Sequence, residues 1–222
     1  MTVNPSGLHF TSSEGREAPT AMTGAHAQLE GLAPSRSSLT DGIRVREILG
    51  IPIAMTDYDG AMDVMDEMIA SRKPGYVVAA PVHAVMVGRD DPEMHTALLG
   101  STLTVPDGMP VVWAANWLGE NLPDRVYGPE LMRRYNRRCA ERGHRVWLYG
   151  GRDQGSLVQL ALSMRRKHPG IDVVGGYSPP FRALTPEEED SIVVQINAAG
   201  PDVLWVGIGV PKQEKWMARM RD

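Results

Sequence analysis

Residues 202–214 constrain the fold more than any other stretch of this 222-residue chain. They run from apolar, mostly β-branched residues into Gly207 and Gly209, and then into Pro211, which favours the first turn of a helix. A strand that ends in glycines just before a helix N-terminus is typical of open α/β sheets that hold anionic ligands at this edge. The segment therefore predicts a phosphate or nucleotide site. The polar residues that open its helix are Lys212, Gln213 and Glu214.

The rest of the chain from Val45 onward alternates between strand-like and helix-like segments. Strands are predicted at 45–53 (an extended segment or hairpin), 76–80, 102–105, 145–149, 171–174 and 203–207. Helices are predicted at 57–70, 82–99 (interrupted near 90–92), 109–118, 129–142, 154–167, 185–199 and from 211. Such alternation favours right-handed crossovers. We therefore expect an α/β, Rossmann-like fold whose mainly parallel sheet carries helices on both faces.

Composition divides the chain into a tail and one domain. Residues 1–40 are rich in Gly, Ser, Thr, Ala and Pro without a hydrophobic period, which predicts a disordered N-terminal tail before a domain at 41–222. The formal net charge of −4 argues against nucleic acid as a partner. The single cysteine, Cys139, lies in a predicted helix and excludes an internal disulfide, so we interpret it as buried filler.

The N-terminus carries no secretory signal, and the longest apolar runs are shorter than the roughly 20 residues that span a bilayer. We therefore expect a cytoplasmic protein, with peripheral contact to the cytoplasmic face of the membrane left open.

Asp57 and Asp59 form a D-x-D pair, which holds a divalent metal in many sugar-nucleotide enzymes. Acids in the first turn of a helix also favour its positive end, and Thr56 with Asp59 has the spacing of a capping box. We favour this second interpretation. The histidines are scattered and no zinc motif is present, so no metal site is predicted.

Asp107 directly follows a predicted buried strand. A carboxylate at the carboxyl edge of a parallel sheet is well placed to act as a general base. The same residue could instead cap the helix predicted from Met109. The spacing alone leaves both interpretations open.

Other predicted ligand contacts are weaker. Gly150-Gly151 and the Gly207-x-Gly209 pair let backbone N–H groups approach a phosphate, but neither completes a dinucleotide fingerprint. Arg125 could pair with a diphosphate or with a surface acid, and Tyr177 could stack on a base or be an ordinary turn tyrosine.

Taken together, these segments resemble the WecG/TagA/CpsF family of bacterial glycosyltransferases over about 45–222. The matching pieces occur in family order and are Asp91-Pro92-Glu93, Val-Pro-Asp-Gly-Met-Pro (105–110), Arg-Val-Tyr-Gly-Pro-Glu (125–130), Trp-Leu-Tyr-Gly-Gly (147–151), His-Pro-Gly-Ile (168–171), Gly-Gly-Tyr (175–177), Pro-Asp-Val-Leu-Trp-Val-Gly (201–207) and Gly-Val-Pro-Lys-Gln-Glu (209–214).

The resemblance implies an inverting, metal-independent transferase without a cofactor. It would move N-acetylmannosamine, N-acetylmannosaminuronic acid or a related sugar from a UDP donor to a polyprenyl-diphosphate-linked sugar during cell-surface polysaccharide synthesis. Asp107 matches the family's proposed base, and Gln213 matches a pocket residue. The remaining positions that it assigns to substrate binding are Gly108, Arg125, Gly128, Gly150, Gly151, Tyr177, Gly207, Gly209, Lys212 and Glu214.

Three departures from the family pattern bear on these expectations. Ala79-Ala80-Pro81 stands where many members have Thr-x-Asn, and Asn116 stands where an arginine is usual, which puts the sugar specificity in doubt and fits an exopolysaccharide branch. Family chains also continue beyond Pro-Lys-Gln-Glu into a basic C-terminal region, whereas this sequence stops at Asp222. We therefore expect a fragment or an incomplete enzyme, and an exposed apolar patch could make it self-associate.

Two alternatives remain at this point. The chain could bind a UDP-sugar without turnover, or it could be an NAD-dependent oxidoreductase, which only the α/β pattern and the glycine pairs favour.

Overall fold

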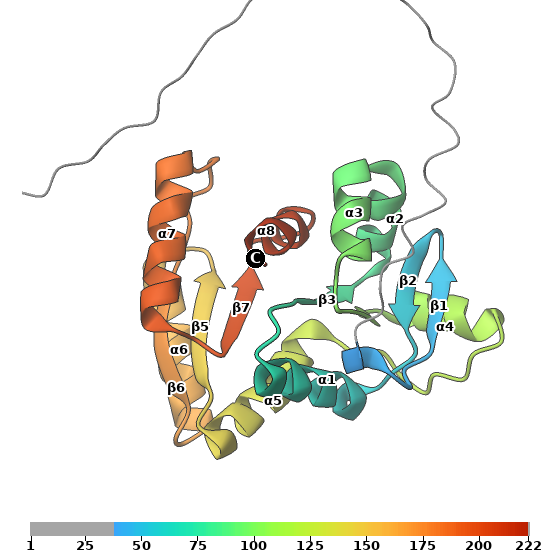
Figure 1. Cartoon of the computed structure of the whole chain (residues 1–222), viewed down its shortest axis with the longest axis horizontal. Coiled ribbons are helices and arrows are strands. Elements are labelled where there is room, and N and C mark those ends of the chain that lie inside the picture. The colour runs from blue at the N-terminus through green and yellow to red at the C-terminus, as the bar shows by residue number, and fades with distance from the viewer. Residues whose placement is uncertain (1–37, 222) are drawn as a thin grey trace, which may run out of the picture. The chain divides into compact units, whose positions relative to one another are not determined.

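A computed structural model describes residues 38–221 (Figure 1). The elements are η1 (Ser38–Thr40), β1 (Val45–Ile48), β2 (Ile51–Ala54), α1 (Tyr58–Ser71), β3 (Val77–Ala80), α2 (Val82–Asp90), α3 (Pro92–Leu99), β4 (Leu103–Pro106), α4 (Met109–Trp117), α5 (Gly128–Arg142), β5 (Arg145–Gly150), α6 (Gln154–Lys167), β6 (Asp172–Tyr177), α7 (Pro186–Ala199), β7 (Val203–Gly207) and α8 (Lys212–Met220). Residues 1–37 of the predicted tail at 1–40 lie outside the described residues.

The strands form three small sheets. β1 and β2 make the predicted antiparallel hairpin, with Val45 opposite Ala54. β3 pairs with β4 in parallel, and β5 pairs in parallel with both β6 and β7. The predicted α/β, Rossmann-like fold is confirmed. Within the described part of the chain, β3 and β7 each pair along one edge only.

Helices α1, α3, α6 and α7 begin after residues whose side chains cap the first turn. At the start of α7 the Thr185 hydroxyl accepts a hydrogen bond from the backbone N–H of Glu188, and the Glu188 carboxylate accepts one from the backbone N–H of Thr185. The predicted break between α2 and α3 is also confirmed, because Asp91 caps α3.

The predicted capping box at Thr56 is wrong. Asp57 is the N-cap of α1, and its carboxylate accepts from the N–H of Gly60 at 2.9 Å. The helix begins at Tyr58, one residue later than predicted, so the cap moves by one position. The Thr56 hydroxyl contacts the Asp57 carbonyl at 3.4 Å instead.

Ion pairs fix α8 between its neighbours. Lys215 contacts Asp91 at 2.7 Å and Glu93 at 2.8 Å on the α3 side, and Arg219 contacts Glu189 of α7 at 2.9 Å. Figure 1 shows α8 lying between β7 and α3, both of which it packs against. The helix that carries the Pro-Lys-Gln-Glu residues therefore has a defined position.

One hydrophobic core includes buried residues of both parallel sheets, among them Val105 of β4, Leu148 of β5 and Val203 of β7. Cys139 lies in this core, as predicted, and burial raises the pKa of its thiol to about 12. Such a thiol is inert near neutral pH.

None of the helices in the part of the chain that the structure describes combines the length and the hydropathy needed to cross a bilayer.

Candidate active site

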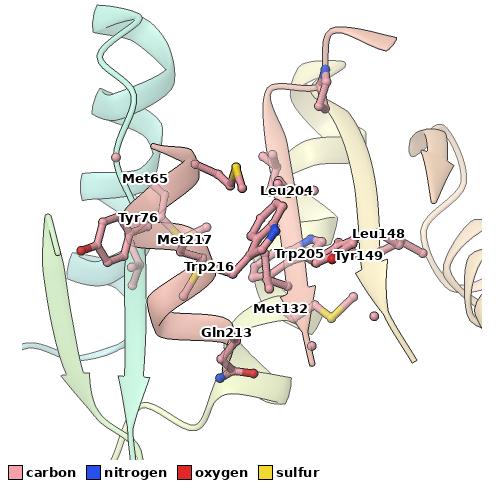
Figure 2. Close-up of a pocket in the computed structure, with 18 of the residues that line it drawn as sticks. Met65, Tyr76, Met132, Leu148, Tyr149, Leu204, Trp205, Gln213, Trp216 and Met217 are labelled. Atoms are coloured by element: carbon pink, nitrogen blue, oxygen red, sulfur yellow. The ribbon is translucent and has the colours of Figure 1, made fainter. Parts of the chain in front are cut away.

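A cavity of about 930 Å³ runs between β3 and β7 (Figure 2). Its walls include residues of both edge strands, of β5 and of α8. At the carboxyl ends of the strands, the predicted site residues that line it are Asp107, Gly128, Gly150, Gly151, Gly207, Gln213 and Glu214. The structure thus places Asp107 and Gln213, which are about a hundred positions apart in sequence, around one cavity.

Asp107 does not cap the helix that follows it. Gly108 is the N-cap residue of α4, and that helix has no side-chain cap. The backbone N–H of Asp107 instead donates to the carbonyl of Ala80 at the end of β3, which fixes the residue at the sheet edge. The capping interpretation of Asp107 is therefore excluded, and its carboxylate is free for another use.

The environment of the Asp107 carboxylate raises its pKa above the ordinary value. One oxygen is buried without a hydrogen-bond partner among the described residues. Burial raises the pKa of Asp107, and a backbone hydrogen bond from Gly128 and the charge of Arg125 oppose that rise in part. A carboxyl with a raised pKa in a cavity suits proton transfer.

Gln213 and Glu214 form a second polar group in the same cavity. The Gln213 amide donates to the Glu214 carboxylate at 2.9 Å, and the Gly209 N–H donates to the Gln213 oxygen at 3.2 Å. Glu214 is fully buried, and its second oxygen has no hydrogen-bond partner in the described chain. Burial therefore raises the pKa of Glu214, and the Gln213 hydrogen bond and the charge of His83 oppose this to a smaller extent.

Gly150 allows two strand ends to approach each other closely. Its φ is +135°, and a Cβ added there would lie 2.2 Å from the carbonyl oxygen of Gly207. The next residue, Gly151, donates its N–H to that same carbonyl at 3.3 Å. Only glycine fits this contact, which brings the ends of β5 and β7 together beside the cavity.

Aromatic side chains that the sequence patterns did not indicate form one wall of the cavity. The Trp216 ring stacks on Tyr149 with 4.4 Å between centroids, and the Trp205 indole N–H donates to Asn136 at 3.0 Å. Figure 2 shows Trp216 extending from α8 toward Tyr149 of β5. Tyr149 lies next to the end of β5, whereas Trp205 lies in the middle of β7, opposite Leu148, so strand position alone does not indicate that both line the cavity.

Five of the predicted site residues do not line the cavity: Gly108, Arg125, Tyr177, Gly209 and Lys212. Arg125 lies 4.7 Å from the Tyr127 ring centroid, and it is close enough to Asp107 to affect its pKa. Tyr177 ends β6, which extends three residues further than predicted, and stacks on Tyr149 at 6.3 Å. Their binding roles stay predictions.

No group of three or more His, Cys, Asp or Glu side chains in the described residues is arranged to hold a metal ion. Asp57 of the D-x-D pair is the helix cap described above.

Asn116, a departure from the family pattern, has a structural role. Its amide nitrogen donates to the Leu122 carbonyl at 2.9 Å, and its oxygen accepts from the Leu122 N–H at 2.7 Å. This pair of bonds holds the loop that follows α4.

The fold and the cavity define a Rossmann-like α/β protein with a buried carboxylate at the strand ends, where such proteins bind ligands. The glycosyl transferase WecG/TagA/CpsF family matches residues 46–222, and the chain belongs to this family. One curated relative is the N-acetylglucosaminyldiphosphoundecaprenol N-acetyl-beta-D-mannosaminyltransferase of Bacillus spizizenii (strain ATCC 23059 / NRRL B-14472 / W23). It is 24% identical over 149 residues, which cover 67% of this chain and 56% of the relative.

Proposed function

We propose that this chain binds a UDP-sugar and transfers its sugar, of the N-acetylmannosamine type, to a polyprenyl-diphosphate-linked acceptor. The reaction inverts the anomeric centre, needs no metal ion, and serves cell-surface polysaccharide synthesis at the cytoplasmic face of the membrane. The observation that carries this proposal is the shared cavity of Asp107, Gln213 and Glu214, with a buried carboxylate oxygen left without a partner in the described chain. Family membership and the name of the relative support the reaction class.

Asp107 is the general base of this reaction. Its carboxylate removes the proton from the acceptor hydroxyl while that oxygen bonds to the anomeric carbon of the donor. The bond from this carbon to the UDP oxygen breaks, and UDP leaves with the electron pair. A raised pKa makes Asp107 a stronger base than an exposed aspartate, provided that it is ionised at the working pH.

Charge that develops on the departing UDP needs electrostatic stabilisation. The glycine turn at Gly150-Gly151 lies before the N-terminus of α6, and the Gly207 turn precedes that of α8. Backbone N–H groups and helix N-termini in this position favour a diphosphate. Arg125 does not line the cavity, but its charge reaches Asp107 and adds a nearby cation.

Titration calorimetry with UDP, a UDP-sugar and NADH tests the binding site. We expect UDP and the UDP-sugar to bind and NADH not to bind. A protein that binds NADH but not UDP would be an oxidoreductase and would contradict the proposal.

An assay of UDP release, with a lipid-diphosphate sugar as acceptor, then separates transfer from binding alone. Acceptor-dependent release of UDP supports the transferase. Binding of UDP-sugar without any release of UDP would support the alternative, a UDP-sugar-binding module without turnover. This alternative is considered because the match covers only 56% of the relative's length.

A further inference from the structure

The helix that follows Asp107 carries an exposed apolar face. Trp113 is 62% exposed, Trp117 is 92% exposed and Leu118, at the C-cap of α4, is 49% exposed. The two tryptophans are four residues apart and therefore lie on the same side of the helix. The opposite side is buried in the core through Val112 and Ala115. We call Trp113, Trp117 and Leu118 the α4 face.

Tryptophan is an unusual residue to leave in water, because its ring contributes a large apolar area. It is enriched where membranes meet water, since the indole body is apolar while its N–H remains polar. The α4 helix itself contains no charged residue, so no charge on it opposes contact with an apolar phase.

A cationic rim lies beside the α4 face. Arg44 and Arg46 both contact the carboxylate of Glu120, at 3.1 Å and 2.7 Å. The Glu120 side chain is only 4% exposed, whereas those of Arg44 and Arg46 are 74% and 43% exposed. The positive charges therefore face solvent and the negative charge is covered. Glu120 follows α4 closely, and α4 packs against β1, which carries Arg46 (Figure 1).

A lipid bilayer fits the α4 face and its arginine rim better than a second copy of the chain does. An apolar tryptophan face with an arginine rim is complementary to a bilayer that exposes anionic phosphate groups. A stable protein dimer buries about 800 Å² on each partner, which is much more than three side chains provide.

The α4 face also lies close in the chain to the proposed base. α4 begins two residues after Asp107 and, at nine residues, is about 13 Å long by the rise of an α-helix. If the acceptor is polyprenyl-linked, which rests on the proposed function, its hydrocarbon chain stays in the membrane while its sugar reaches Asp107. The protein surface near Asp107 must then meet the bilayer.

We propose that the α4 face, with Arg44 and Arg46, is a docking surface for an anionic lipid bilayer. The tryptophans enter the interfacial region, and the arginines contact lipid phosphates. The contact orients the cavity toward lipid-linked acceptors without a membrane-spanning segment.

Co-sedimentation with vesicles tests this proposal. The protein should bind vesicles of phosphatidylcholine with phosphatidylglycerol, and should bind weakly to phosphatidylcholine alone or at high salt. Replacing both tryptophans (Trp113→Ser with Trp117→Ser) should lower binding about tenfold or more, because each loses its apolar contact with lipid. The matched control is Phe181→Ser, which removes an 87% exposed aromatic ring away from α4 and should leave binding unchanged.

Two further measurements distinguish loss of membrane contact by the tryptophans from loss of the folded UDP site. Lipids brominated in their acyl chains should quench the tryptophan fluorescence of the wild type but not that of the double variant. UDP binding in solution, measured without lipid, should be the same in both proteins, since neither tryptophan lines the cavity.

Three results would overturn the docking proposal. The first is that the wild type does not bind anionic vesicles. The second is that the double variant binds them as well as the wild type does. In the third, the α4 face instead mediates a dimer, seen as a mass that doubles with concentration in the wild type and not in the double variant, without lipid binding. Failure of the wild type to bind UDP would count against the proposed function alone and would leave the vesicle result standing.

Discussion

Asp107 and Glu214 line the same cavity, and each has one buried carboxylate oxygen without a hydrogen-bond partner among the described residues. Burial raises the pKa of both groups. Unsatisfied buried oxygens cost free energy, which a bound ligand that donates hydrogen bonds would recover. Because Asp107 and Glu214 titrate with raised pKa values, the stability of the chain should depend on pH. The proposed activity should depend on the same two residues.

Replacing Glu214 by glutamine should change how stability depends on pH. The folded-state pKa of Glu214 lies above its ordinary value of 4.5, so between the two values the folded state binds more protons than the unfolded state. The free energy of unfolding therefore falls as the pH rises through this window. Glu214→Gln removes this loss, so its stability relative to wild type should increase as the pH rises from 4.5 through the raised pKa of Glu214.

Urea unfolding at several pH values measures this difference. Glu141→Gln, a change at a side chain that is 63% exposed, is the matched control and should follow the wild type. A stability difference between Glu214→Gln and wild type that stays constant with pH would show that Glu214 does not titrate in this window.

The pH dependence of transfer should report Asp107. A general base works only when it is ionised, so kcat/KM should fall as the pH drops through the raised pKa of Asp107. The midpoint of this acid limb should lie above about 3.9, the ordinary value for an exposed aspartate. An activity that stays level down to pH 4 would disagree with the environment of Asp107 described here.

Gly150→Ala should strongly destabilise the fold. The added Cβ would meet the Gly207 carbonyl in addition to the strain of a positive φ, and we expect a loss of about 3 kcal/mol or more. Gly119→Ala is the control, because Gly119 has a φ of +94° and no atom within 4 Å of an added Cβ. The strain alone should cost it about 1 kcal/mol. Equal losses of unfolding free energy for the two variants would mean that the strand ends separate easily.

The order of elements could be predicted from the sequence because strand, glycine turn and helix start follow each other in short, local patterns. The wrong cap at Thr56 arose because Asp57 offers an equivalent cap one residue later, and local spacing does not distinguish the two. The burial of the Asp107 carboxylate and the stacking of Trp216 on Tyr149 depend on elements that are far apart in sequence. Periodicity carries no information on such contacts.

The exposure of Trp113 and Trp117 also could not be predicted from the sequence. The α4 segment is apolar on all sides, so its pattern does not indicate which side faces the core. Only the packing of Val112 and Ala115 against buried residues of β2 and β3 settles the orientation.

The central claim is that Asp107 acts as the base at the cavity that binds the donor. The most direct test compares UDP-sugar affinity and acceptor-dependent UDP release in wild type, Asp107→Asn and the surface control Asp190→Asn, which changes an exposed residue of α7. We predict that Asp107→Asn binds the UDP-sugar about as well as wild type but transfers about 10²- to 10⁴-fold more slowly, while the control is unchanged. Near-normal turnover by a folded Asp107→Asn protein would contradict the account.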